Sequence, residues 1–240
     1  MKIKILTLFP NMIESFKNES IIKRAIDKGI VSIDVIDIRE YSTEKHHHVD
    51  DTPCGGGAGM VLKVDVVHSA IMANKSNNSK VIMMTPQGEV YNQKKAYELS
   101  KLNEIMIVCG HYEGFDERIR SYVDLELSIG DFVLTGGEIA SMAISDSIIR
   151  LLDNAINTES HLDDSFSNGL LEYPQYTRPI EYDSMKVPEV LLSGNHKEIN
   201  RFRKKESLRR TYLRRKDLLD KYELSKEDEI LLKEIMEEEK

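Results

Sequence analysis

The stretch CGHYEGFDERIRSYVDLELSIGDFVLTGGE, residues 109–138, places five glycines in two loops within a pattern of strand and helix. They are Gly110, Gly114, Gly130, Gly136 and Gly137. A glycine within regular structure costs roughly 0.5–1 kcal/mol relative to alanine, because it loses more conformational freedom on folding. The two loops therefore raise the question of what they hold that needs bare backbone.

Strand and helix patterns alternate around this stretch over the first 150 residues. Strands are predicted at residues 3–9, 31–38, 80–85, 104–110 and 124–129; residues 31–38 alternate at period two, whereas residues 80–85 form a continuous apolar run. Helices are predicted at residues 20–28, 65–74, 92–101, 115–123 and 138–152. Residues 39–60 are predicted to form a long loop, since they are dense in turn formers. The alternation is typical of an α/β domain with a mainly parallel sheet.

The pattern changes after the last of these helices. Residues 153–183 lack periodicity and are rich in acids, Ser, Asn and Gly, which predicts a linker or a mobile functional loop. Asn195 and Ser225 suit the N-caps of two later helical segments. The predicted parts are a first domain over residues 1–160, a flexible linker over 161–175 and a small helical domain over 176–240.

Composition indicates a globular protein, and the cytoplasm is its expected location. The chain is 40% hydrophobic and 31% charged, and its apolar runs fall short of the roughly 20 residues that span a membrane. The amino terminus, MKIKILTLFP, is typical of a first strand and not of a signal peptide. Cys54 and Cys109 are far apart and form no C-x-x-C pair, which argues against a disulfide framework and a thiol-rich zinc site.

The distribution of charge sets one segment apart. The formal net charge is −8, yet residues 201–216 (RFRKKESLRRTYLRRK) hold nine Lys or Arg and one Glu. Shorter charge runs are usually solvated helix faces. A run this one-sided within an acidic chain favours a phosphate-backbone partner such as a folded RNA.

Three predicted loops follow successive strands of the sheet: TPQG (85–88), CGHYEG (109–114) and SIGDFVLTGG (128–137). Ligands of parallel sheets bind beyond the carboxyl ends of strands. Each loop alone is more typical of a tight turn, but the three together favour a ligand site. CGGGAGM (54–60) lacks the Lys-Ser/Thr of a phosphate-binding loop, and no G-x-G-x-x-G follows a strand. The expected ligand is therefore not held by a pyrophosphate.

Three consecutive histidines, His46, His47 and His48, suggest a metal site. Adjacent side chains point in different directions, however, and this spacing does not match zinc patterns. We favour a loop that faces RNA or solvent.

Eight short motifs carry a resemblance that covers nearly the whole chain. In order they are LTLFP (6–10), CGGGAGM (54–60), TPQG (85–88), CGHYEGFDER (109–118), SIGDFVLTGGE (128–138), DSF (164–166), YTRP (176–179) and LLSGNH (191–196). Together they closely resemble the bacterial tRNA (guanine-N1) methyltransferases, which belong to the SPOUT class of knotted methyltransferases. Their shared order makes the resemblance far more specific than any one motif.

The resemblance implies a fold and a cofactor. The fold is an α/β domain whose mainly parallel sheet carries a trefoil-knotted site for S-adenosylmethionine, followed by a small all-helical carboxyl-terminal domain. The implied cofactor-binding residues are Pro86, Gln87, Gly110, Glu113, Ile129, Gly130, Asp131, Phe132, Val133, Leu134, Gly136 and Gly137. The glycines would let knotted backbone close around the cofactor. General rules of chain topology would not have predicted a knot.

The resemblance also implies methyl transfer to N1 of guanine 37 in tRNA, next to the anticodon. Asp164, on the linker, is the implied general base, and Arg150 is the implied donor to the guanine oxygen. Asp163 is the alternative base if the alignment moves by one residue. Without the resemblance, Asp164 would be assigned as a solvated loop acid and Arg150 as a helix-end cation.

Partners follow from the same resemblance. They are the anticodon stem-loop of tRNA and a second copy of the chain, with the site between the knot of one subunit and the small domain of the other. The expected RNA-binding residues are Arg209, Arg210, Arg214 and Arg215. The family also implies Mg²⁺ in turnover, although the sequence shows no dedicated metal cage.

The chain departs from the family pattern at three positions. Ala140, Phe132 and His111 stand where the family often has Pro, Tyr and Arg. The first two differences bear on cofactor affinity, and the third on the role of that side chain at the active site. Two alternatives stay open: a knotted methyltransferase acting on another RNA base or position, and a non-catalytic RNA-binding protein that kept the fold.

Overall fold

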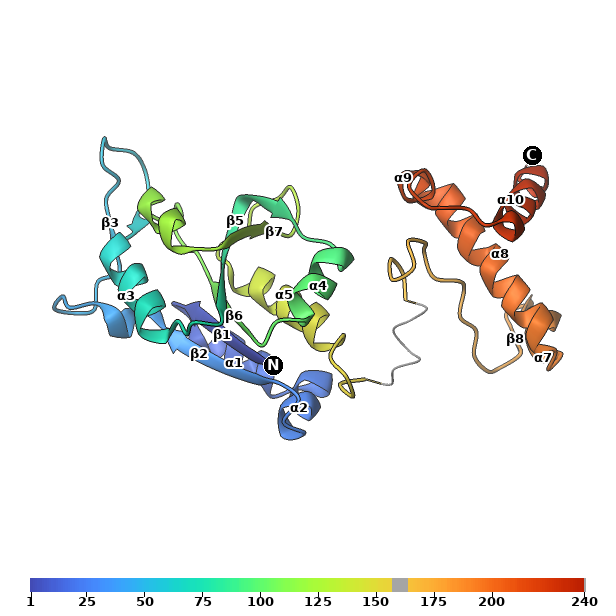
Figure 1. The fold of residues 1–240 in the computed structure, drawn as a ribbon, viewed down its shortest axis with the longest axis horizontal. Coiled ribbons are helices and arrows are strands. Elements are labelled where there is room, and N and C mark those ends of the chain that lie inside the picture. Colours follow the sequence, from blue (N-terminus) through green and yellow to red (C-terminus); the bar gives the residue numbers. More distant parts are fainter. Residues whose placement is uncertain (157–163, 240) are drawn as a thin grey trace. The chain divides into compact units, whose positions relative to one another are not determined.

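The chain folds into two compact units, Met1–Thr158 and Glu159–Lys240 (Figure 1). Each unit has a hydrophobic core of its own. The computed structural model describes residues 1–156 and 164–239. The first three residues of the predicted linker, 161–163, lie outside the described residues.

The first unit is built on a five-stranded parallel sheet in the order β2-β1-β6-β5-β7 (Figure 1). Its strands are β1 (Lys2–Thr7), β2 (Ser32–Asp37), β5 (Ser79–Val90), β6 (Glu104–Val108) and β7 (Leu125–Ser128). The prediction of an α/β fold with a parallel sheet is confirmed. A small antiparallel pair joins β3 (Asp50–Asp51) to β4 (Val61–Leu62).

Helices cover both faces of this sheet. They are α1 (Pro10–Lys17), α2 (Ser20–Asp27), α3 (Val64–Asn74), α4 (Gln93–Ser100) and α5 (Glu138–Ile149), with 3₁₀ helices η1 (Ile38–Tyr41) and η2 (Glu117–Tyr122). In β6, Ile105 and Ile107 face the core under α1, α2, α4 and α5, whereas Met106 and Val108 face the core under α3 and η2. Strands buried on both faces are apolar throughout, which is why residues 105–108 of β6 form a continuous apolar run and do not alternate.

Three local predictions need correction. A helix, α1, begins at Pro10, where none was expected; proline suits a first helical position because its missing N–H would have no partner there. The loop predicted at residues 39–60 contains most of η1 and all of β3. The helix predicted at residues 115–123 is the 3₁₀ helix η2, capped by Asp116.

The second unit is mainly helical, as predicted, with a short hairpin added. Its elements are β8 (Glu181–Tyr182), β9 (Met185–Lys186), α7 (Glu189–Leu192), α8 (His196–Arg214), α9 (Lys216–Leu219) and α10 (Lys226–Glu238). Asn195 and Ser225 are the N-caps of α8 and α10, as predicted, and Ser225 also forms a capping box with Asp228. The core of the unit consists of Leu170, Leu208, Leu219, Leu231 and Ile235.

None of the described helices combines the length and apolar character that crossing a membrane requires.

Candidate active site

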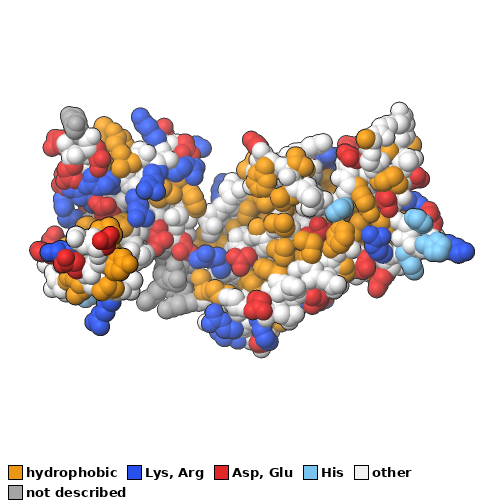
Figure 2. Space-filling model, turned by 180° about the vertical axis from the view of Figure 1, so that it is seen from behind, with side chains coloured by type: hydrophobic (Ala, Val, Ile, Leu, Met, Phe, Trp, Pro, Cys, Tyr) orange, Lys and Arg blue, Asp and Glu red, His pale blue; other side chains and the backbone are white. Residues whose placement is uncertain are grey.

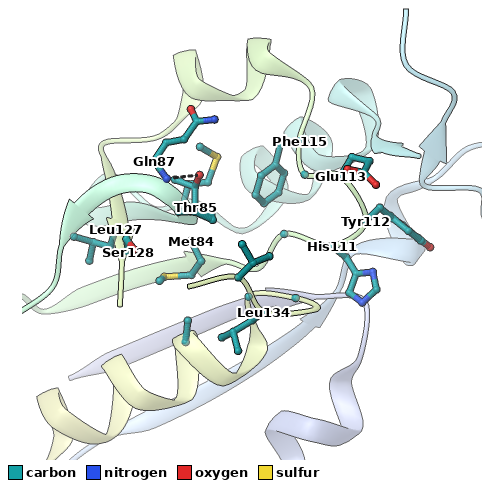
Figure 3. A pocket seen from close by; sticks show the side chains of 18 of the residues that line it. Met84, Thr85, Gln87, His111, Tyr112, Glu113, Phe115, Leu127, Ser128 and Leu134 are labelled. Atoms are coloured by element: carbon teal, nitrogen blue, oxygen red, sulfur yellow. Dashed lines mark hydrogen bonds between the residues drawn. The ribbon is translucent and has the colours of Figure 1, made fainter. Parts of the chain in front are cut away.

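A pocket of about 360 Å³ lies at the carboxyl ends of β6 and β7 and beside the distal half of β5 (Figure 3). Its walls come from β5, from the loop after β6 and from the loop that joins β7 to α5. The structure brings together here every predicted cofactor-binding residue except Asp131. Met84 and Phe115 also line the pocket and were not predicted.

Backbone approach between two loops explains the glycines. The N–H of Gly137 donates to the carbonyl of Gly110 at 2.8 Å. A Cβ on Gly137 would lie 2.8 Å from the Cα of Cys109 and 3.0 Å from the nitrogen of Gly110. A Cβ on Gly110 would lie 2.8 Å from the ring of Phe115. Because side chains at Gly110 and Gly137 would push the two loops apart, this close approach requires glycine at both positions.

The TPQG segment requires a correction. It was predicted as a turn after a strand, but β5 continues through it to Val90, with a shift of register against β7 between Met84 and Glu89. A Cβ on Gly88 would lie 2.5 Å from backbone atoms of β7, so this glycine permits close strand packing. The shifted segment turns Gln87 toward η2, where its side chain accepts a hydrogen bond from Arg120.

A buried carboxylate lies directly after the pocket residue Gly137. Glu138, at the start of α5, is 3% exposed and accepts a hydrogen bond from the Thr7 hydroxyl at 2.7 Å. The same hydroxyl accepts the N–H of Phe9 at 2.9 Å, which ties the end of β1 to α5. Burial, and then the charge of Glu138, raise the pKa of Cys109, which disfavours the nucleophilic thiolate form. Sequence reasoning missed Thr7 and the role of Glu138, although Glu138 ends a glycine motif.

The three departures from the family pattern all lie at the pocket. Ala140 is buried in the pocket wall, and Phe132 lies against Gly130 while remaining half exposed. The ring of His111 packs 4.9 Å from those of Phe9 and Tyr112. Its Nδ1 is buried without a hydrogen-bond partner in the described part of the chain.

The two predicted catalytic residues belong to different units. Arg150 is the C-cap of α5 in the first unit, and Asp164 begins the described part of the second unit. The alternative base, Asp163, lies outside the described residues.

The segment that carries Asp164 is docked on α8. Leu170 is fully buried in the core of the second unit. The N–H of Leu171 donates to Thr211 at 2.9 Å, and its carbonyl accepts from Ser207. Residues 164–173, predicted as linker, are therefore packed against the helical part of the chain.

Many of the basic side chains of α8 meet acids on α10. Arg209 pairs with Glu206, Glu238 and Glu239, and these contacts raise the pKa of its guanidinium against the effect of burial. Arg215 pairs with Asp217 at 2.7 Å. Within the described residues, Arg210 and Arg214 form no ion pair. Of the four arginines predicted to bind RNA, Arg209 and Arg215 are thus ion-paired within the described residues, whereas Arg210 and Arg214 are not.

The described residues do not fit a dedicated metal site. Across residues 1–156 and 164–239, no group of three or more His, Cys, Asp or Glu side chains could hold an ion. The expectation of Mg²⁺ therefore gains no support from the ligands of this chain. The rings of His46 and His48 lie 6.3 Å apart, edge to face, on an exposed loop.

Comparison with known proteins gives consistent matches over the full chain. Residues 1–221 match the family model described as tRNA (Guanine-1)-methyltransferase TrmD. The chain is 58% identical over 240 residues to the tRNA (guanine-N(1)-)-methyltransferase of Fusobacterium nucleatum subsp. nucleatum, covering 100% of both. It is 55% identical over 238 residues to the protein of that name from Geobacillus kaustophilus, covering 98% of each. The one from Malacoplasma penetrans is 54% identical over 222 residues, 92% of this chain and 98% of the relative.

Proposed function

The chain belongs to the tRNA (guanine-1)-methyltransferase family, and we propose that it transfers a methyl group from S-adenosylmethionine to N1 of guanine 37 in tRNA. The observation that carries this proposal is the pocket at the strand ends, which gathers the glycines of two separate loops. Such a pocket, at the carboxyl edge of a parallel sheet, is where this class of fold binds ligands.

The pocket fits the cofactor in size and chemistry. Its volume of about 360 Å³ lies in the range of small-molecule sites. Backbone of the loops near Gly110 and Gly130 lines the pocket and can offer donors and acceptors, while Met84, Ile129 and Leu134 offer apolar surface for a purine ring. When bound, S-adenosylmethionine supplies an electrophilic methyl group on a sulfonium. We propose that these loops form the trefoil knot of the family.

The chemistry at guanine requires a base and a donor. N1 of guanine carries a proton, so it becomes a nucleophile only when that proton is removed. We assign this step to the carboxylate of Asp164. Negative charge then develops on the guanine oxygen, and we assign its stabilisation to the guanidinium of Arg150.

The variant Asp164→Asn tests the assignment of the base. A general base contributes roughly 10²–10⁴-fold, so turnover should fall by that factor. Binding of S-adenosylmethionine should stay near the wild-type value, because the pocket residues belong to the other unit. Wild-type turnover in the variant would show that another group removes the proton.

A homodimer is the proposed assembly. Several apolar side chains of the first unit are exposed, and Figure 2 shows hydrophobic side chains gathered on its face. The exposed apolar side chains of the first unit include Phe9, Met12, Val133 and Ile139, and Val133 is 84% exposed. Such surface supports a protein partner, and a second copy is the partner that the family implies. Sedimentation equilibrium of the purified chain would test this, and a monomer at micromolar concentration would contradict it.

One experiment separates this function from its alternatives. Purified protein is incubated with S-adenosylmethionine and unmodified tRNA that carries G or A at position 37, and the product is digested and analysed by mass spectrometry. The proposal predicts 1-methylguanine at position 37 and no product with A. Methylation of another base would favour a different RNA methyltransferase, and binding without methylation would favour a non-catalytic RNA-binding protein.

A further inference from the structure

Helix α8 carries a first row of cations that is already neutralised. Residues four apart lie on one face of a helix, which places Arg201, Lys205 and Arg209 in one row. Arg201 pairs with Glu234 at 2.6 Å, and Lys205 pairs with Glu234 at 2.9 Å. Hydrogen bonds from Lys205 and Arg209 lower the pKa of Glu238 to about 2. This row holds α10 against α8.

A second row on α8 has no such partners. Arg203, Arg210 and Arg214 are seven and four residues apart, so they lie within about 40° of one another around the helix axis. In the described residues none of the three is ion-paired, and Arg214 is exposed. Figure 2 shows Lys and Arg side chains gathered on the second unit, with acidic side chains between them. Arginine presents a planar fork of donors that matches phosphate oxygens.

The second row borders the segment that carries Asp164. The guanidinium of Arg203 lies over the ring of Tyr173, 4.9 Å from its centroid. Ser207 and Thr211, beside this row on the helix, bind both backbone groups of Leu171. A group bound at Arg203 would therefore act directly on a side chain of the Asp164 segment.

We propose that Arg203, Arg210 and Arg214 form a phosphate-binding row for the RNA backbone, and that Arg203 is a positioning residue for the segment bearing Asp164. This inference rests on the proposed function, since it takes tRNA as the ligand. A phosphate held by Arg203 fixes the guanidinium over Tyr173 and so fixes the carboxyl end of the segment that begins at Asp164. Of the arginines predicted from sequence to bind RNA, Arg210 and Arg214 belong to this row, whereas Arg209 belongs to the α10 contact.

Salt dependence of tRNA binding tests the row. The probe is an unmodified tRNA transcript with G at position 37, bound to the full chain over a series of KCl concentrations. Each lost phosphate contact reduces the slope of log K against log[salt] by about 0.7–0.9, which weakens binding about 5–8-fold at 0.1 M salt. Arg210→Gln and Arg214→Gln should each show this change, and the triple variant with Arg203→Gln should lose about 2–3 in slope.

Arg201→Gln is the matched control, since it removes the same charge from the same helix. It should keep the wild-type slope. A wild-type slope in the triple variant, or an equal decrease in Arg201→Gln, would overturn the phosphate-binding row. Thermal melting of each variant checks that the second unit remains folded.

Kinetics test the positioning role of Arg203. Arg210→Gln should raise KM for tRNA with little change in kcat, whereas Arg203→Gln should also lower kcat at saturating tRNA, by up to about 10²-fold if the base is misplaced. Arg203→Lys keeps the charge and should restore the salt slope, but it should not restore kcat fully because it lacks the planar contact with Tyr173. An unchanged kcat in Arg203→Gln would refute the positioning role.

The proposed function and this inference can fail separately. If the wild-type chain leaves guanine 37 unmethylated, the proposed function is wrong whatever the binding slopes show. If the wild-type chain methylates guanine 37 but the three variants bind tRNA with the wild-type salt dependence, only the proposal of a phosphate-binding row is wrong.

Discussion

The contact between the two glycine loops gives the sharpest test of the pocket. In Gly137→Ala, the new Cβ would lie 2.8 Å from the Cα of Cys109, whereas carbon atoms pack at about 3.5–4.0 Å. The loops must therefore separate by roughly 0.7 Å or more, which also lengthens the hydrogen bond from Gly137 to Gly110. Overpacking of this kind costs about 1–3 kcal/mol. If the strain is relieved where the loops form the pocket, the Kd for S-adenosylmethionine rises about 5- to 150-fold.

Isothermal titration calorimetry with S-adenosylmethionine measures this effect, and thermal melting measures the loss of stability. Gly29→Ala is the control: it follows α2, and a Cβ there meets nothing within 4 Å. Its φ of +69° makes alanine unfavourable, so it should lower the melting temperature without changing cofactor affinity. Wild-type affinity in Gly137→Ala would show that close approach of these loops is not what forms the cofactor site.

Two further predictions concern buried and paired carboxylates. Thr7→Val should cost about 1–3 kcal/mol, because it removes the donor to buried Glu138, and a melting temperature lower by about 2–4 °C per kcal/mol would confirm it. Glu238→Gln should lower the melting temperature near neutral pH, because Glu238 has a pKa of about 2 in the folded chain against an ordinary value of 4.5. The stabilisation by Glu238 is present above about pH 4.5 and is lost as the pH falls toward 2. The difference in melting temperature between Glu238→Gln and wild type should therefore shrink over that window. A difference that stays constant would contradict the lowered pKa of Glu238.

The fold of the first unit was largely predictable because its signals are local. Strands β5 and β6 contain short apolar runs, and α4 has its N-cap at Asn92, whose side chain accepts the N–H of Lys95. Parallel strands that share an edge place their loops side by side, so the grouping of the glycine loops into one pocket followed from sequence. The continuation of β5 through TPQG did not, since a shift of register depends on the neighbouring strand β7.

The roles of the charged residues were harder to predict, because ion pairs form between segments that are distant in sequence. Arg209 and Arg210 are neighbours with the same chemistry, yet only Arg209 points toward the acids of α10. The acidic last segment was visible in the sequence, but its position against α8 follows from the burial of Leu231 and Ile235 in the same core as Leu208. A one-sided charge run is thus partly a packing feature and partly a candidate binding surface.

The division of the chain has a consequence for how its activity can be measured. The pocket and Arg150 belong to one unit, and Asp164 and the second arginine row of α8 belong to the other. Variants in the pocket should therefore act first on the Kd of the cofactor. Variants in the second unit should act on tRNA affinity and kcat while cofactor binding persists. The two classes should become coupled only when tRNA is present, because the proposed mechanism takes a carboxylate from one unit and a guanidinium from the other only at the substrate base. Cofactor affinity that responded to Asp164→Asn without tRNA would mean that the two units communicate before the substrate arrives, and the assignment of separate tasks to them would have to be abandoned.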